Sequence, residues 1–202
     1  NIFGCSPEDV LEDFTPIAKV IFPEDTDSVI NEIEYSAKHL TIFNCEYRIQ
    51  LPGKAVQWVY ARSTPEKLDD GSITWYGFIT DFTRRKEAEA SIRKLSSAIE
   101  QSPVTVVITD TKGSIEYVNP KFTELTQYTF EEVVGKSPAV LKTGYTSPEE
   151  YKIMWDTINS GAEWNGTFLN KNKNGELFWE SAKISPLRNT EGKITHFVAA
   201  RL

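Results

Sequence analysis

Few residues in this sequence have types and spacing that could support chemistry. The two cysteines, Cys5 and Cys45, and the two histidines, His39 and His196, stand far apart, and no Cys-x-x-Cys motif occurs. No His lies at ligand spacing from a Cys, so we expect neither a disulfide framework nor a structural zinc site. The sequence also lacks a Gly-x-Ser-x-Gly nucleophile turn, a Walker phosphate loop and a Gly-x-Gly-x-x-Gly motif. We therefore predict that this chain is not itself an enzyme.

Charge, hydropathy and cysteine content indicate which partners and which cellular compartment to expect. The 202 residues carry 22 Lys and Arg against 29 Asp and Glu, a formal net charge of -7. Such a field repels phosphate, so we expect no nucleic-acid partner. No segment approaches the ~18–20 apolar residues of a membrane-spanning helix, so we expect no membrane contact by this chain. The low cysteine content fits a reducing, cytoplasmic setting.

Acidic residues gather towards the N-terminus and allow two interpretations. One is a cation site. The other is a solvated surface with acids in the first turns of helices, which we favour because such acids complement the helix dipole. The acids concerned are Glu8-Asp9, Glu12-Asp13, Glu24-Asp25 and Asp27.

The predicted helices and strands that must position any site occur twice along the sequence. Residues 6–11 resemble residues 129–134, and Gly71-Ser72-Ile73-Thr74 matches Gly192-Lys193-Ile194-Thr195. The two matches keep nearly the same offset, which indicates a duplicated domain. Each copy has a predicted helix, a strand, a glycine turn, a strand containing Trp58 or Trp179, and a last strand. The helices are predicted at 25–40 and 148–160, and the first strands at 43–50 and 163–171.

Three strands joined by short turns predict an antiparallel meander, so each copy is of the α+β class. The second copy has an earlier hairpin as well, with strands predicted at 104–110 and 114–118. The first copy has too few preceding residues for this hairpin. We therefore expect it to lack about two N-terminal strands.

Between the copies, residues 84–101 are rich in Glu, Lys, Arg and Ala, with apolar residues at Ala88, Ile92, Leu95 and Ile99. Their 4-3-4 spacing places all four on one face of a helix. This linker helix either pairs with a second copy in a dimer or packs on its own domain.

The ordered motifs resemble tandem PAS domains, the sensory modules of histidine kinases and cyclic-di-GMP enzymes. Asp81-Phe82-Thr83-Arg84-Arg85-Lys86 is similar to the box that ends many PAS domains, and Phe22-Pro23-Glu24-Asp25 is similar to the family's H-P-x-D segment. In the second copy, the segments that stand where the family has its second strand and following helices are Ile115-Glu116-Tyr117-Val118-Asn119-Pro120, followed by Phe122, and Gly135-Lys136-Ser137-Pro138. The resemblance implies a first domain at 1–83, a linker at 84–101 and a second domain at 102–202. Each PAS fold is a five-stranded antiparallel sheet with flanking helices and a pocket.

The resemblance also suggests where a signal would pass. The Asp81 carboxylate and the Thr83 hydroxyl stand where the last strand of the first domain meets the exit helix, and they can satisfy free N–H groups at the helix start. We assign them as candidate relay residues. A simple helix cap is the alternative.

The second half is more similar to flavin-binding redox sensors of the PAS family. Their elements correspond here to Met154-Trp155, Trp164-Asn165-Gly166, Asn170 with its polar turn, and Phe178-Trp179-Glu180. The resemblance implies that the Asn170 amide and the Glu180 position face the isoalloxazine edge, and that Trp164 lies near the adenine side. Trp155 and Trp179 complete the candidate cofactor site. Ordinary core or surface packing is the alternative for all three tryptophans.

Three departures limit the resemblance. Pro138 stands where photosensory relatives have their adduct-forming Cys, which excludes that light reaction, and Arg201 replaces their flavin-sensing Gln. Ser137 replaces the usual Asn of the redox subgroup. Two alternatives therefore stay open for the second domain: a pocket that binds FAD and a pocket that binds no cofactor. Haem is less favoured, because His39 at a helix C-terminus is typically solvated.

The sequence therefore predicts the sensory and dimerisation region of a signal-transduction protein of the histidine kinase or diguanylate cyclase type. The second pocket would sense a ligand or the redox state, with FAD as one candidate group. The signal would pass through the exit helices to an output domain of the same polypeptide. We expect a homodimer and a chain that ends before its own output helix. The alternative is a cofactor-free pair of PAS domains that serves only interaction and dimerisation.

Overall fold

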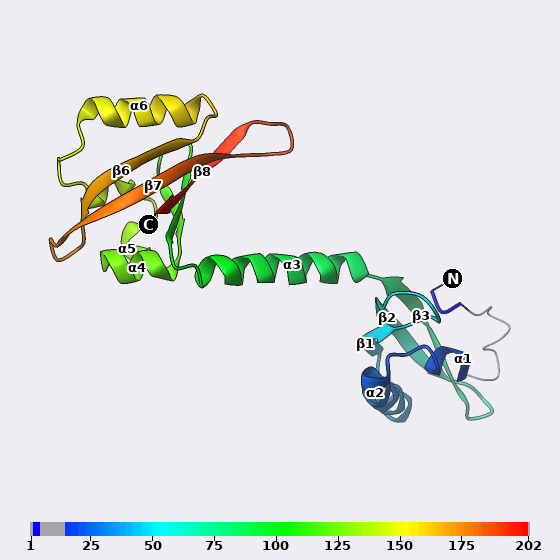
Figure 1. Ribbon diagram of the computed structural model, residues 1–202. Coiled ribbons are helices and arrows are strands. Elements are labelled where there is room, and N and C mark those ends of the chain that lie inside the picture. Colours follow the sequence, from blue (N-terminus) through cyan, green and yellow to red (C-terminus); the bar gives the residue numbers. More distant parts are fainter. Residues whose placement is uncertain (1, 5–14, 202) are drawn as a thin grey trace. The chain divides into compact units, whose positions relative to one another are not determined.

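A computed structural model describes residues 2–4 and 15–201 (Figure 1). The repeat segment at 6–11, Cys5, the acids at 8, 9, 12 and 13, and the chain end at 202 lie outside the described residues. The chain divides between Ile92 and Arg93 into two compact units. Each unit has its own sheet and its own core.

The first unit is a three-stranded antiparallel sheet with helices on one face. Its helical elements are α1 (Thr15–Ala18), η2 (Pro23–Asp25) and α2 (Thr26–His39), and its strands are β1 (Phe43–Ile49), β2 (Gln57–Lys67) and β3 (Ile73–Asp81), in the order β1-β2-β3 (Figure 1). The strands form a meander because short turns connect each to the next. Among the described residues β3 has no neighbour on its far side.

Alternation along β1 decides which side chains enter the first core. Phe43, Tyr47 and Ile49 are buried, while the residues between them are not. They pack with Val29 of α2 and Val59 of β2. The helix ends at Leu40, which adopts a left-handed conformation (φ 50°) and whose N–H donates to the Ser36 carbonyl.

Helix α3 (Thr83–Glu100) follows β3 and has 18 residues, none of them buried. Its predicted apolar face is open, because Ile92 and Leu95 are 67% and 65% exposed. The predicted alternative in which this face packs on its own domain therefore finds no support.

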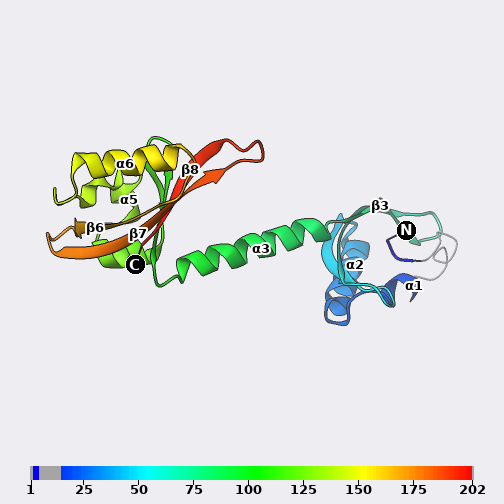
Figure 2. The same ribbon diagram turned by 45° about the horizontal axis from the view of Figure 1, so that its top comes forward.

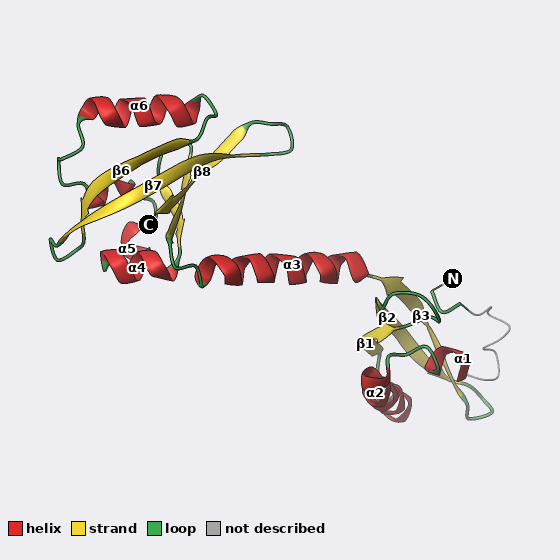
Figure 3. Ribbon diagram, viewed as in Figure 1, coloured by secondary structure: helices red, strands yellow, loops and turns green. Residues whose placement is uncertain are grey.

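The second unit is a five-stranded antiparallel sheet in the order β5-β4-β8-β7-β6. Strands β6, β7 and β8 of this sheet are labelled beside α6 in Figures 2 and 3. Its strands are β4 (Thr105–Asp110), β5 (Ile115–Val118), β6 (Trp164–Lys171), β7 (Leu177–Arg188) and β8 (Ile194–Arg201). Its helices are α4 (Pro120–Thr126), α5 (Phe130–Val133), η3 (Pro138–Leu141) and α6 (Pro148–Asn159). Strands β4 and β5 form a hairpin that has no counterpart among the described residues of the first unit, and β4 pairs with β8.

Capping residues stabilise the first turns of helices in the second unit. Ser147 and Glu150 form a reciprocal capping box at α6, and Thr129 with Glu132 forms another at α5. The start of α6 also has Pro148 at its first position, where the missing N–H costs nothing. Helix α6 lies over one face of the sheet (Figure 1). Its residues Met154 and Ile158 belong to the core.

The structure confirms the predicted fold class. Both halves are antiparallel sheets with flanking helices, and the first sheet has three strands against five in the second. No helix among the described residues is long and apolar enough to span a bilayer.

Candidate ligand cavity and helix junctions

The second unit has a small, partly open cavity between its sheet, η3 and α6. Its volume is about 100 Å³. Met154 and Ile158 of α6, with Phe168, Ile184 and Phe197 of the strands, form its apolar wall. The polar lining comes from Thr109, Ser137, Lys142, Tyr151, Asn170 and Arg201.

Beside this cavity lies a buried polar network centred on Glu180. Glu180 is 1% exposed. Its Oε2 accepts hydrogen bonds from Asn170 Nδ2 at 2.8 Å and from Arg201 Nη1 at 3.1 Å. Oε1 accepts from the Thr105 hydroxyl at 3.1 Å. An unpaired carboxylate in such a place would be costly, and these three donors stabilise it. The network thus joins β4, β6, β7 and β8.

Arg201 completes the ion pair but is itself incompletely paired. The residue is 7% exposed, and its Nε is buried without a hydrogen-bond partner among the described residues. Buried polar atoms without partners are rare in folded proteins, so the unpaired Nε of Arg201 indicates a specific role for this side chain.

The three candidate tryptophans lie in different places. Trp155 lines the cavity and meets Phe197 edge to face at 5.9 Å between ring centroids. Trp164 stacks on Phe168 at 5.1 Å and packs against the core without lining the cavity. Trp179 is 58% exposed and contacts Tyr145, because it neighbours Glu180 on β7 and adjacent strand residues face opposite ways. The structure therefore brings Asn170, Glu180 and Trp155 together and sets Trp179 apart.

Gly113 has a structural reason to be glycine. It adopts a φ of +84°, and a Cβ there would come within 2.8 Å of the Trp155 ring. Any side chain would strain the turn and push this ring, so the turn after β4 fixes one wall of the cavity.

In the cavity lining, the Lys142 ammonium lies 3.6 Å from the centre of the Tyr151 ring. The Tyr151 ring also stacks on Phe168 at 5.8 Å. Burial raises the pKa of the Tyr151 hydroxyl, so this group is neutral at physiological pH. A cation–π contact of this kind holds a positive charge in the cavity lining.

Sequence comparison adds the family. Residues 103–200 match a family described as "PAS domain", and residues 1–79 match one described as "PAS fold". The chain belongs to the PAS family. Each half is one PAS domain, and the prediction of tandem PAS domains is confirmed.

Relatives of these PAS domains occur in signalling proteins. A nitrogen fixation regulatory protein of Klebsiella pneumoniae is 31% identical over 101 residues, which cover 50% of this chain and 20% of that protein. A blue-light-activated histidine kinase of Brucella anthropi is 30% identical over 110 residues, 53% of this chain and 22% of that protein. The chain thus spans about a fifth of the length of these relatives.

Among solved structures, an RNA-binding light-oxygen-voltage receptor matches with a TM-score of 0.50 and 15% identity. The match covers 100% of this chain and 88% of that one. At this identity it shows a shared fold and no more.

The predicted relay residues of the first PAS domain are in contact. Asp81 Oδ1 accepts from the Thr83 hydroxyl at 2.6 Å and from the Thr83 N–H at 2.9 Å. The Thr83 oxygen in turn accepts from the Trp58 N–H of β2 at 2.9 Å. The hydroxyl and N–H of Thr83 hold the pKa of Asp81 below its usual range. The first turn of α3 is therefore bonded to both β2 and β3.

A matching junction, not predicted from the sequence, lies in the second PAS domain. Asn119 is 0% exposed; its Oδ1 accepts from the Val106 and Phe122 N–H groups, and its Nδ2 donates to the carbonyls of Ile99 and Val104. One side chain therefore caps α4, holds β4 and bonds the last turn of α3. An Asn before a Pro at a helix start was the available signal, because Asn is a favoured N-cap residue.

The other chemical candidates have ordinary roles. Cys45 is a free, half-buried thiol whose pKa is raised, mainly by burial. His39 Nδ1 lies 3.0 Å from the Tyr35 carbonyl at the exposed end of α2. Within residues 2–4 and 15–201, no three His, Cys, Asp or Glu side chains group as metal ligands.

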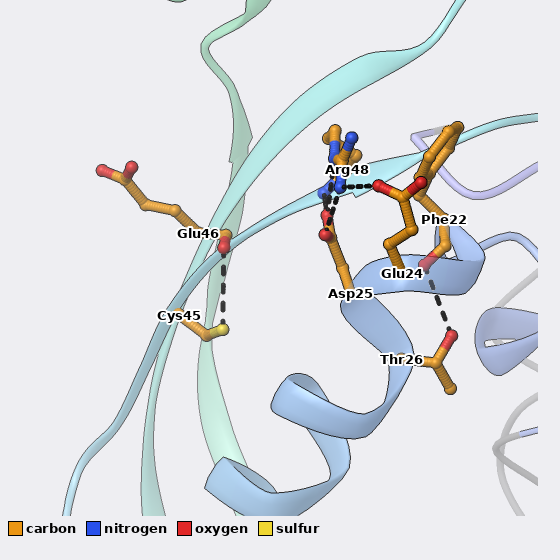
Figure 4. A network of polar contacts seen from close by, with 7 residues as sticks. All are labelled: Phe22, Glu24, Asp25, Thr26, Cys45, Glu46 and Arg48. Carbon is orange, nitrogen blue, oxygen red and sulfur yellow. Dashed lines mark hydrogen bonds and ion pairs between the residues drawn. The ribbon is translucent and has the colours of Figure 1, made fainter.

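The first PAS domain has a pocket of about 700 Å³ between α2 and its sheet, lined by residues that include Val29, Phe43 and Trp75. It also has a polar cluster where α2 begins. Arg48 of β1 donates from Nε and Nη2 to the two Asp25 oxygens at 2.9 and 2.6 Å, and also reaches Glu24 (Figure 4). Its guanidinium lies 4.3 Å from the Phe22 ring centre. The Asp25 acid of the H-P-x-D-like segment thus ties the start of α2 to β1. Hydrogen bonds from Arg48 hold the pKa of Asp25 below its usual range.

This depressed pKa predicts a pH dependence. The Asp25 carboxylate stabilises the first domain at and above its unfolded-state pKa of about 3.9, and the contribution is lost as the pH falls through the lower folded-state value. Asp25→Asn should therefore destabilise the first domain at pH 7 and flatten the acid limb of its stability curve. Urea unfolding of the first domain at pH 7 and in steps below pH 5 measures both effects. The exposed Asp27→Asn is the control, and equal curves for the two variants would contradict the assignment.

Proposed function

We propose that this chain is the sensory and dimerisation region of a signalling protein of the histidine kinase or diguanylate cyclase type. Residues 1–83 form the first PAS domain, residues 84–101 the linker and residues 102–202 the second PAS domain. The names of its relatives, a nitrogen fixation regulator and a histidine kinase, support this assignment. Catalysis belongs to an output domain elsewhere in a cytoplasmic polypeptide.

One observation carries the proposal: helix α3 is hydrogen-bonded to a PAS domain at each of its ends. Thr83 bonds the first turn to β2, and Ile99 in the last turn accepts from Asn119. A helix held in this way responds to rearrangement of the strands that hold it. Sensory signals are transmitted when a ligand binds one of two such arrangements more tightly than the other.

The cavity of the second PAS domain is connected to this junction. Asn170 lines the cavity and donates to Glu180, and Glu180 accepts from Thr105 at the start of β4. The carbonyl of Val104, next along the chain, accepts from Asn119, which also bonds Ile99 of α3. A ligand that moves Asn170 or Glu180 would thus shift the position of α3. The contacts give a route, and coupling along it is the proposal.

FAD is the more specific expectation for this cavity. Ligand pockets usually measure about 300–1,000 Å³, whereas this cavity measures about 100 Å³. The Asn170 amide, which would face the flavin ring, donates to Glu180 instead. In this arrangement the residues do not fit an isoalloxazine ring, and we derive no step through it.

The experiment is to identify what the purified protein carries and what its removal does. We expect a colourless sample, and mass measurement of the denatured extract identifies any released molecule. Hydrogen exchange at residues 83–100 should differ between the loaded and stripped protein, and identical exchange would overturn ligand relay. A flavin spectrum would restore FAD, and then Asn170→Ala with Trp164→Ala should lower the flavin content while exposed Asn165→Ala does not.

The second candidate is a cofactor-free pair that serves only dimerisation. The exposed apolar face of α3, with Ile92 and Leu95 more than half exposed, favours this function. The same face serves the sensory proposal, so the two differ only in whether the cavity is used.

Dimerisation through α3 predicts a charge-sensitive mass. Ile92→Glu combined with Leu95→Glu places two carboxylates on the apolar face and should convert dimer to monomer in light scattering, because like charges oppose across a helix pair. Ala90→Glu with Ser97→Glu adds the same charge to the opposite helix face, given 3.6 residues per turn, and should leave the dimer intact. A dimer that survives the first pair of changes would exclude this face.

A further inference from the structure

Arg201 presents an unused hydrogen-bonding edge in the cavity of the second PAS domain. Nη1 donates to Glu180 at 3.1 Å, whereas Nε is buried and without a partner among the described residues. Arg201 lines the cavity and is 7% exposed. Nε and the second Nη of a guanidinium form the side-on edge that binds the two oxygens of a carboxylate.

The charges around the cavity favour an anion. The Glu180 carboxylate neutralises the charge of Arg201. It accepts hydrogen bonds from three protein groups, on Thr105, Asn170 and Arg201. Lys142 adds a second positive charge to the lining, and no carboxylate belongs to that lining. A single negative charge would therefore balance the site, and it would satisfy the Nε that the protein leaves unpaired.

The volume limits the size of this anion. An apolar cavity of ~150 Å³ accommodates benzene, with six heavy atoms. A cavity of about 100 Å³ accommodates fewer. Met154, Ile184 and Phe197 offer an apolar wall for a methyl or ethyl group.

We propose that the second PAS domain binds a short-chain monocarboxylate of the size of acetate or propionate, with its carboxylate on the side-on edge of Arg201 and its alkyl group on the apolar wall. This inference rests on the proposed sensory function and names the class of its ligand. The surface-facing Lys142 draws the anion in, and Arg201 holds it.

The test uses the full chain with acetate as the probe. Thermal unfolding is followed in sodium acetate and in sodium chloride of the same ionic strength, and binding is confirmed by saturation-transfer NMR on the acetate methyl group. We expect a saturable rise in the transition of the second domain with acetate. Acetamide, which has the same shape without the charge, should give none. Propionate should bind and a longer chain such as hexanoate should not.

Arg201→Lys separates this role from folding. The lysine keeps a cation beside Glu180 but removes Nε and the side-on edge, so the acetate dissociation constant should rise at least about tenfold. Exposed Arg62→Lys is the control. If Arg201→Lys does not fold, the paired change Glu180→Gln with Arg201→Gln removes both buried charges together and should also abolish binding.

Equal effects of acetate and acetamide, or acetate binding that survives in both Arg201 variants, would overturn the inference. Absence of any response to either carboxylate would do the same. The proposed function would stand in that case if the purified protein releases another molecule whose removal alters exchange in α3. It would fall with the inference only if exchange in α3 is also unresponsive.

Discussion

Asn119→Ala is expected to destabilise the second PAS domain by about 3–5 kcal/mol. The side chain is fully buried and makes four hydrogen bonds, two as acceptor and two as donor. Loss of an N-cap alone costs about 1 kcal/mol. Each buried group left without a partner adds about 1–3 kcal/mol, and the carbonyl of Val104 and the N–H of Val106 are among them.

Hydrogen exchange measures this loss domain by domain, because the slowest amides of β4 and β8 report the free energy of global opening. Asn165→Ala is the matched control, since Asn165 is exposed on β6. A loss below about 1 kcal/mol for Asn119→Ala would show that water replaces these bonds.

Asn119→Asp separates the cap from the helix junction. The carboxylate keeps the acceptor for Phe122 and Val106 but loses both donations to the carbonyls of Ile99 and Val104. Exchange should therefore rise in the last turn of α3 more than in α4. Equal increases in both helices would argue that Asn119 does not connect them.

Glu180→Ala has a comparable expected effect, a loss of about 3–5 kcal/mol, because it leaves the Arg201 guanidinium buried without its ion partner. The pair is 2% and 6% exposed in its side chains. Asn170 and Thr105 also lose the acceptor for their donors, since both bond this carboxylate. Urea unfolding, read by exchange in the second domain, measures the effect.

A double-mutant cycle distinguishes the ion pair from simple loss of packing. Glu180→Leu combined with Arg201→Met should destabilise less than either single change, because no lone charge stays buried. The exposed pair of Lys183 and Glu163 provides the control, and Glu163→Ala should leave stability nearly unchanged. Additive effects at Glu180 and Arg201 would mean that the two charges do not stabilise each other.

The fold could be predicted because its signals are local and occur twice. The predicted strand at 43–50 is observed as Phe43–Ile49, and the predicted helix at 84–101 as Thr83–Glu100. Alternation of apolar residues and glycine turns fixed these elements within a residue or two at each end. The prediction that the first domain lacks about two strands came from counting residues before the repeat, and the sheet that the structure describes there has three strands.

The site was less accessible to sequence reasoning. Asn170 and Glu180 lie together, but Trp179, one residue from Glu180, faces the other side of β7. Counting strand parity would have separated them. The partners of Glu180, Thr105 and Arg201, lie 75 and 21 residues away, and only the folded sheet brings them together. A cavity volume likewise depends on packing that no local pattern records.

Within residues 2–4 and 15–201, no strand pairs with the far side of β3, whereas its counterpart β8 has strands on both sides. Such an edge is a template for intermolecular pairing, and Tyr76 and Phe78 on it are more than half exposed. Preparations of this segment thus have two ways to self-associate, by helix or by sheet. Pairing of β3 with β3 of a second copy would close as a dimer, just as pairing of two α3 helices would, so mass alone does not distinguish the two routes.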